Sequence, residues 1–326
     1  MNLADVPTDK VNALLERSAG LRAGSPSDVA KGRLLGLLFL NPSLRTRTSM
    51  IGAWGYLGGT SAILSPGDGV WELATGDGPM LSTSAEHIEE AAGVLGRLCD
   101  VLGVRAFAGG DNWEQDRKDS LMASFAEFAD APLINMESGM YHPCQALADW
   151  LTLEDHKVER NAKIVLSWAY HPKALQQAVP NSALLMAAQR GMQVSVLRPD
   201  GFALDSGVME QAHKLAEASG GQISETDDPA TLADAQVVQA KSWGSLEHYS
   251  DQEASTKLRE KYRDWCVGND KLPVPDSAKF MHCLPVRRDV VATRSIIKSK
   301  NSVVLDQAVN RKWAQASILE AMARGV

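Results

Sequence analysis

Short apolar runs alternate with helical patterns from one end of the chain to the other, and this alternation constrains the fold more than any other feature. In the helical segments apolar residues recur three and four positions apart, whereas runs such as LLGLLFL (34–40) suit strands buried on both faces. Strands that alternate with helices form parallel sheets covered by helices. At roughly 150 residues per domain, the 326 residues give about two domains. The sequence therefore predicts an α/β fold with two doubly wound parallel-sheet domains.

The expected elements follow this alternation in both halves of the chain. The expected strands are 34–40, 61–64, 101–107, 132–135, 164–167, 193–197, 236–240, 280–282 and 302–305. The expected helices are 46–57, 85–99, 120–128, 181–189, 208–218, 253–262 and 308–323. The alternation restarts after a helix that begins near Pro143, so the boundary between the two domains is expected there.

Charge and composition exclude several classes of protein. The chain has 33 Lys and Arg against 40 Asp and Glu, a net charge of −7, which disfavours a broad surface for nucleic acid or anionic membranes. The run 34–40 is far shorter than the ~20 residues of a membrane-spanning helix, and MNLADVPTDK lacks the apolar core of a signal peptide. We therefore expect a cytoplasmic protein without a membrane or nucleic-acid partner.

Metal sites and disulfides are not expected either. The four cysteines show no CxxC spacing and no pairing with histidine of the kind that zinc sites use. Walker and dinucleotide-binding glycine motifs are also missing.

The strongest local signal is the string LLGLLFL-NPSLRTRTS, in which a buried strand runs into a turn and then a helix. Free backbone N–H groups at the helix start, the hydroxyl of Ser43 or Thr46 and the guanidinium of Arg45 would converge on one anion. Ser43 alone could be only a helix cap, and Arg47 could pair with a structural carboxylate. Together these residues predict a phosphate site.

Two further clusters follow expected strands, where ligands of open α/β sheets bind. The first is His142-Pro143-Cys144-Gln145, and the second is the string HCLPVRR (282–288). A lone histidine or cysteine at such a place is more often a core residue than a catalyst. A long loop rich in Gly, Pro and Asp (65–84) carries Trp71, which is either an anchor for a ligand or a neighbouring subunit, or a side chain that only packs down.

The strings SLRTR, HPCQALAD and HCLPVRR, in this order, closely resemble the transcarbamylases, which move a carbamoyl group from carbamoyl phosphate to an amine. The resemblance extends over essentially the whole chain. It implies a carbamoyl-phosphate domain (1–143), an amino-substrate domain (144–305) and a final helix (306–326) that returns to the first domain. It also implies a homotrimer with active sites shared between subunits, no cofactor and no metal.

The resemblance also assigns site residues. Ser43, Leu44, Arg45 and Thr46 resemble the phosphate cradle, Arg105, His142 and Gln145 the group that grips the carbamoyl carbonyl, and Arg311 a further guanidinium of the phosphate site. Trp71 resembles a tryptophan that reaches the phosphate site of a neighbouring subunit. Cys283 and Leu284 are expected to orient the attacking amine, Cys283 without acting as a nucleophile.

The acceptor amine is indicated by what the chain lacks. Ornithine transcarbamylases carry an Asp and a Ser-Met-Gly loop for the free α-amine, and here the strand VVQA leads instead to Lys241-Ser242-Trp243-Gly244. Losing the acidic partner is consistent with an acylated, uncharged α-amine. The string AKSW, with WAYHPK and the long loop, resembles the branch that acts on N-acetyl- or N-succinylornithine in arginine biosynthesis. In that branch Glu137, Asn181 and Lys241 would contact the acylornithine.

The prediction of the acyl group rests on the residue that directly precedes the pair Glu86-His87. The acetyl branch is expected to have Glu there and the succinyl branch Pro, whereas this chain has Ala85. A carboxylate at this place would repel a succinyl group, so its loss slightly favours succinyl, as does Val291, where the acetyl enzymes carry lysine. Alternatively, Ala85 only starts a helix and acetyl is the natural group. The chain could also act on a different amine, or be a non-catalytic relative that only binds carbamoyl phosphate.

Overall fold

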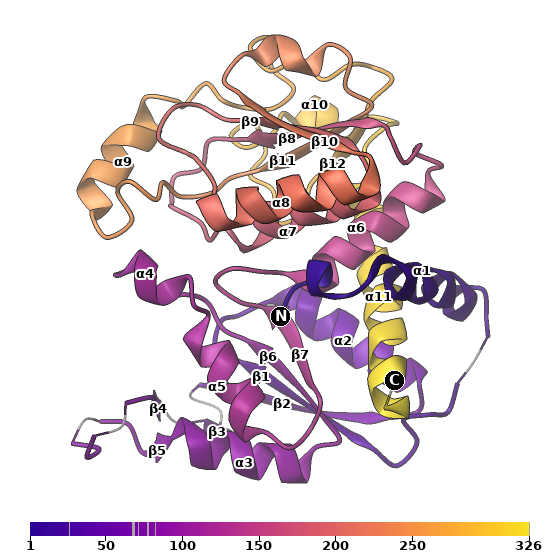
Figure 1. The fold of residues 1–326 in the computed structure, drawn as a ribbon, viewed down its shortest axis with the longest axis vertical. Coiled ribbons are helices and arrows are strands. Elements are labelled where there is room, and N and C mark those ends of the chain that lie inside the picture. The colour runs from indigo at the N-terminus through magenta and orange to yellow at the C-terminus, as the bar shows by residue number, and fades with distance from the viewer. Residues whose placement is uncertain (26, 67–68, 71, 77, 82, 326) are drawn as a thin grey trace.

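The structure is a computed structural model that describes residues 1–25, 27–66, 69–70, 72–76, 78–81 and 83–325. Two five-stranded sheets form the cores of two stacked layers (Figure 1). The strand orders are β3-β2-β1-β6-β7 and β10-β9-β8-β11-β12, and every pair within them is parallel. The predicted α/β fold with two parallel sheets is therefore confirmed.

The first sheet is built around an almost wholly buried central strand. Its strands are β1 (Leu34–Phe39), β2 (Thr60–Pro66), β3 (Gly69–Val70), β6 (Val101–Arg105) and β7 (Leu133–Glu137). Its helices are α2 (Leu44–Tyr56), α3 (Ile88–Leu98), α4 (Trp113–Asp116) and α5 (Ser120–Phe128), and η1 (Leu3–Asp5) and α1 (Thr8–Arg22) precede it. Leu35, Leu37 and Leu38 of β1 are fully covered by neighbours on both faces, as expected for a parallel sheet.

The second sheet repeats this arrangement. Its strands are β8 (Lys163–Trp168), β9 (Gln193–Leu197), β10 (Gln222–Thr226), β11 (Val237–Lys241) and β12 (Lys279–Met281). Its helices are α7 (Ala178–Arg190), α8 (Ser206–Ser219), η2 (Pro229–Leu232), α9 (Gln252–Glu260) and α10 (Arg294–Ile297).

Two buried helices join the layers. The helix α6 (Pro143–Asp155) leads from the first layer to the second, and α11 (Val304–Arg324) runs from the second layer down beside the first (Figure 1). The helix α11 packs against α6, α2 and α1. The start of α11 therefore lies close to the carboxyl ends of both sheets, where ligands are expected.

Some local predictions were wrong or incomplete. Residues 302–305 do not form a strand, because Ser302 makes only an isolated bridge to Phe280 and α11 begins at Val304. The helix α1 and the strand β10 were not predicted; β10 is an edge strand with mostly exposed side chains, so it lacks an apolar run. The expected loop 65–84 includes β4 (Leu73–Ala74), which pairs with β5 (Glu86–His87). No helix among the described residues is long and apolar enough to cross a membrane.

Candidate active site

A cavity of about 310 Å³ lies where the carboxyl ends of the two sheets approach each other. Its walls come from the start of α2, the ends of β6, β7 and β11, the start of α6, and the segments that follow β8 and β12. The lining residues are Ser43, Arg45, Arg105, Phe107, Glu137, His142, Gln145, His171, Ala174, Leu175, Gln176, Val179, Lys241, Ser242, His282, Cys283, Leu284, Pro285, Val291 and Arg311.

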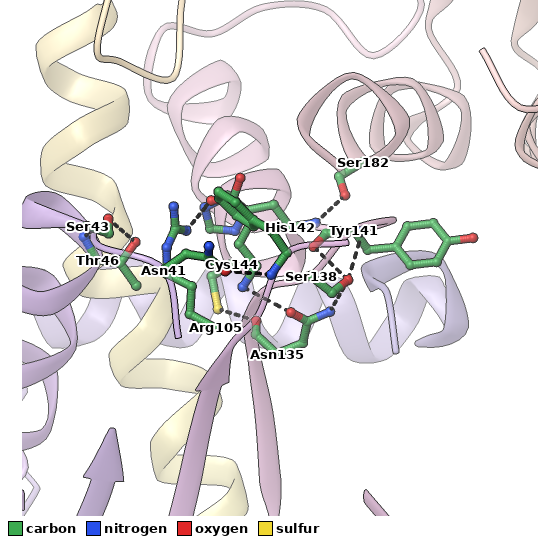
Figure 2. Close-up of polar contacts among 12 residues, drawn as sticks. Asn41, Ser43, Thr46, Arg105, Asn135, Ser138, Tyr141, His142, Cys144 and Ser182 are labelled. Atoms are coloured by element: carbon green, nitrogen blue, oxygen red, sulfur yellow. Dashed lines mark hydrogen bonds and ion pairs between the residues drawn. The ribbon is translucent and has the colours of Figure 1, made fainter. Parts of the chain in front are cut away.

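The first wall is the amino end of α2. Ser43 caps the helix: its Oγ accepts a hydrogen bond from the Thr46 amide at 3.3 Å and donates to Thr46 Oγ1 at 3.0 Å (Figure 2). Arg311 of α11 donates to the same Thr46 hydroxyl at 2.6 Å, and both side chains are buried. Arg45 follows on the cavity wall. Free helix N–H groups and two guanidinium groups thus face one small space, the arrangement that binds phosphate.

The second wall is a charged group on β6, β7 and α6. Arg105 forms an ion pair and a hydrogen bond with Glu137, and His142 Nε2 lies 3.3 Å from the same Glu137 carboxylate. Burial and the nearby Arg311, Arg105 and Lys241 hold the pKa of His142 well below its usual range, so the ring is neutral at pH 7. The His142 backbone N–H donates to Ser182 Oγ of α7 at 2.7 Å, which fixes the start of α6 (Figure 2).

The third wall belongs to the second layer. Burial raises the pKa of the Cys283 thiol, so the group is protonated at neutral pH. His282 Nδ1 accepts from the Leu284 amide at 2.9 Å, and burial lowers the pKa of His282 to about 3. Its Nε2 therefore carries the proton. Lys241 ends β11 nearby, and His171 Nε2 accepts from Arg287 Nε at 3.0 Å.

The lining is strongly cationic. Arg45, Arg105, Lys241 and Arg311 line it, against Glu137 as the single carboxylate among the described lining residues. That carboxylate is already paired with Arg105. The cavity is therefore suited to ligands that carry several negative charges and no ammonium group that needs a counter-charge. In the part of the chain that the structure describes, no group of three or more His, Cys, Asp or Glu could hold a metal ion.

The structure brings most of the predicted site residues together. Ser43, Arg45, Arg105, Glu137, His142, Gln145, Lys241, Cys283, Leu284 and Arg311 line the cavity. Thr46 lies behind Ser43. Asn181 is buried and donates its amide to the Met140 carbonyl at 3.1 Å, without lining the cavity.

Two predicted residues stand apart from this cavity, Leu44 and Ala85. Leu44 is 77% exposed at the first position of α2. Ala85 is exposed, just before β5, and is not in the lining. Trp71 lies outside the described residues.

Sequence reasoning missed other residues at the site. His171, His282 and Phe107 line the cavity without having been given a role, although His282 belongs to a quoted string. Asp149 was also passed over. It stands four positions after Gln145, on the same face of α6, and accepts the Gln145 Nε2–H at 2.6 Å.

Comparison with known proteins identifies the family. Residues 1–155 match the aspartate/ornithine carbamoyltransferase carbamoyl-P binding domain, and residues 173–322 match the Asp/Orn binding domain of the same family. The chain belongs to the aspartate/ornithine carbamoyltransferase family. It is a carbamoyltransferase, and it falls in the N-acylornithine branch of the family.

Relatives from both acyl branches cover most of this carbamoyltransferase. N-acetylornithine carbamoyltransferase of Xanthomonas axonopodis pv. citri is 39% identical over 99% of this chain and 96% of its own length. N-succinylornithine carbamoyltransferase of Bacteroides fragilis is 33% identical over 90% of this chain and 89% of its own. A crystal structure of an N-acetyl-L-ornithine transcarbamylase variant, with one glutamate replaced by alanine, contains carbamyl phosphate and N-succinyl-L-norvaline. It shares 39% identity, covers 99% of this chain and 98% of its own, and has a TM-score of 0.95.

Proposed function

We propose that this carbamoyltransferase moves the carbamoyl group of carbamoyl phosphate to the δ-amine of an N-acylornithine, giving N-acylcitrulline and phosphate. The observation that carries the proposal is the charge of the cavity. Four cations line it, and Glu137 is already paired with Arg105. Phosphate and the α-carboxylate of the acceptor match the cations. An unmodified α-ammonium would enter a desolvated site without a free counter-charge, which is unfavourable.

The proposed reaction uses these residues as follows. The neutral δ-amine attacks the carbamoyl carbon, and the developing oxyanion is stabilised by Arg105, His142 and the Thr46 hydroxyl. The C–N bond forms, and the bond between carbon and the phosphate oxygen then breaks. Arg45, Arg311 and the amino end of α2 stabilise the leaving phosphate, which accepts the proton lost by the amine. Positioning and electrostatic stabilisation supply most of the acceleration.

The acyl group that we propose is succinyl. Ala85 is exposed and outside the cavity of its own chain, so it would approach the acyl group from a neighbouring subunit, where a carboxylate in its place would repel the terminal carboxylate of a succinyl chain. A related acetylornithine transcarbamylase variant in which alanine replaces a glutamate has been solved with N-succinyl-L-norvaline. Val291 adds an apolar side chain to the cavity lining. Acetyl is the second candidate, because an N-acetylornithine carbamoyltransferase shares 39% identity, against 33% for the succinyl relative.

The proposal is tested by product formation from carbamoyl phosphate with ornithine, N-acetylornithine and N-succinylornithine side by side. We expect the highest kcat/KM with N-succinylornithine and almost no product with ornithine. Product from ornithine alone would overturn the proposal, whereas a preference for N-acetylornithine would overturn only the choice of acyl group.

Ala85→Glu is expected to reverse the acyl preference. The added carboxylate repels the succinyl carboxylate, so kcat/KM for N-succinylornithine should fall by about tenfold or more, corresponding to at least ~1.4 kcal/mol. The value for N-acetylornithine should fall much less. Ala85→Gln, of nearly the same size but uncharged, is the matched control and separates charge from bulk. An equal loss with both variants would mean that Ala85 only leaves space.

Cys283→Ser is expected to lower kcat only modestly, by about tenfold or less, because the protonated thiol orients the amine and forms no covalent bond. Steady-state kinetics with both substrates measures this. Complete loss of turnover in a folded variant would show that the thiol takes part in bond formation.

We also propose a homotrimer with shared active sites. Four large apolar side chains are exposed on α2 and α11, two helices that pack against each other: Leu44 (77%), Ile51 (38%), Leu305 (70%) and Val309 (58%). The segment that contains β4 and β5 extends away from its own sheet (Figure 1), and Leu81 there is 90% exposed. Packing of this segment on the α2–α11 face of a neighbour would bury both apolar sets beside the neighbour's phosphate site.

A further inference from the structure

A buried carboxylate lies behind the cavity, at the meeting point of α6, β11 and α11. Asp149 of α6 is wholly buried and accepts three amide hydrogen bonds: from Gln145 at 2.6 Å, from Gln307 of α11 at 2.9 Å and from Gln239 of β11 at 2.9 Å. Within the described ranges no Lys or Arg forms an ion pair with it. Burying an unpaired carboxylate is costly, and the three donors offset part of that cost.

The three bonds decide how each glutamine is turned. An ionised carboxylate only accepts hydrogen bonds, so each glutamine must direct its NH₂ group toward Asp149. Burial raises the pKa of Asp149 to about 6, partly opposed by the three glutamines and by Arg311 of α11, so the carboxylate is mostly ionised at neutral pH and above. For Gln145, this leaves Oε1 without a partner among the described residues, beside the cavity.

The orientation of Gln145 matters for recognition of the carbamoyl group. A carbamoyl group has one carbonyl oxygen that accepts and one NH₂ that donates. Donors for the oxygen are already supplied by Arg105 and His142, whereas a carbonyl oxygen at Gln145 would accept from the NH₂. One N–H of the Gln145 amide is bound to Asp149, which leaves the second N–H for the predicted contact with the carbonyl and leaves Oε1 as an acceptor for the carbamoyl NH₂.

The network also reaches the other layer. Gln307, which donates to Asp149, accepts the His282 backbone N–H through its Oε1 at 2.9 Å. His282 in turn accepts from the Leu284 amide. The Asp149 carboxylate is therefore connected to both the α6 wall of the cavity and the segment 282–284. It fixes the orientation of Gln145 in the first and of Gln307 beside the second.

We propose that Asp149 is a positioning residue: it turns the Gln145 carbonyl oxygen toward the carbamoyl NH₂ and so makes the site selective for carbamoyl phosphate over acyl phosphates that lack this NH₂. This proposal rests on the proposed function in one respect: it requires that the cavity binds carbamoyl phosphate. It does not depend on which amine is the acceptor. Acetyl phosphate, which has CH₃ in place of NH₂, is the matched probe.

Asp149→Asn tests the proposal with little change in shape. Asparagine offers only one acceptor oxygen, and its NH₂ would face at least one glutamine NH₂, so two donors would meet. The Gln145 amide is then no longer fixed in one orientation. We expect the Kd of carbamoyl phosphate, measured by calorimetry without an acceptor, to rise about tenfold or more, and the Kd of acetyl phosphate to change by less than about threefold. The ratio of the two constants should therefore collapse, an effect that a merely structural role would not produce.

A second substitution should restore the ratio. When Asp149→Asn is combined with Gln145→Glu, the new carboxylate accepts from the introduced asparagine amide and still presents an oxygen to the carbamoyl NH₂. We therefore expect most of the selectivity for carbamoyl phosphate to return. Gln239→Leu is the control, because Gln239 also donates to Asp149 but does not line the cavity. It should change the Kd ratio by less than about twofold, whatever it does to stability.

Three outcomes would overturn the proposal. They are an unchanged Kd ratio in a folded Asp149→Asn protein, equal weakening of both phosphates, and absence of rescue by Gln145→Glu. If wild-type protein does not bind carbamoyl phosphate at all, the proposed function fails instead, and the two failures are thereby distinguished. Circular dichroism and thermal unfolding of each variant show whether it is folded.

Discussion

Replacing Arg45 by alanine is expected to lower kcat/KM by roughly 100- to 1,000-fold, the loss typical of removing one preorganised charge from a transition state. Arg311 is bound to Thr46 and Arg105 is bound to Glu137, whereas the Arg45 guanidinium has no hydrogen-bond or ion-pair partner among the described residues. Among the described residues, Arg45 is therefore the cation on this wall whose donors are all free to bind phosphate, whereas Arg311 has one N–H bound to the Thr46 hydroxyl. Loss of Arg45 should weaken carbamoyl-phosphate binding and slow the departure of phosphate.

Arg47→Ala is the matched control for Arg45→Ala. Arg47 is two positions further along α2, exposed and absent from the cavity lining, so it faces away from the site. The Arg47 variant should keep kcat/KM within about threefold of the wild type, the scale of an ordinary surface substitution. Calorimetry of carbamoyl phosphate with both variants checks the assignment. Near-normal affinity in Arg45→Ala would show that the phosphate binds elsewhere.

Local patterns were sufficient to predict the layers and the phosphate-binding turn, and the resemblance to the transcarbamylases supplied most of the other cavity residues. The run 34–40 and its neighbours are apolar where β1 is buried, and the following Ser43 caps α2, the alternative role that the sequence offered for it. Ends of parallel strands meet at one edge of a sheet, so residues that follow β1, β6, β7 and β11 converge without any knowledge of packing. Arg45 was predicted in this way, whereas Arg105, Glu137 and Lys241 were assigned through the resemblance to the transcarbamylases; all four line the cavity.

Residues whose role depends on distant neighbours could not be predicted from this one sequence. Gln239 and Gln307 are 90 and 158 positions from Asp149, and glutamines in a strand and a helix carry no local sign of a shared partner. The direction of the Gln145 amide depends on that partner as well. The wrong prediction of a strand at 302–305 has the same origin. Ser302 makes an isolated bridge to the distant Phe280, and the apolar residues after it already belong to the start of α11.

Two inactive variants are expected to regain activity when their subunits are mixed. Arg105→Ala removes the cation that stabilises the oxyanion, and Trp71→Ala removes the side chain proposed to reach a neighbour's phosphate site. Each homotrimer should therefore be nearly inactive. In mixed trimers some sites combine Arg105 from one subunit with Trp71 from the next, and random assembly of equal amounts restores roughly a quarter of the sites.

The mixing experiment requires exchange of subunits to be shown independently. Tagging one variant and recovering both variants in one oligomer after mild denaturation and refolding shows this exchange. The control is Arg105→Ala mixed with Arg45→Ala: both residues line the cavity of the same chain, so a mixed trimer contains no site with both wild-type residues. Recovery in the first mixture but not in the second places Trp71 in the neighbour's site. If proven exchange gives no recovery in either, Trp71 serves its own subunit, and the exposed apolar side chains of α2 and α11 need another explanation.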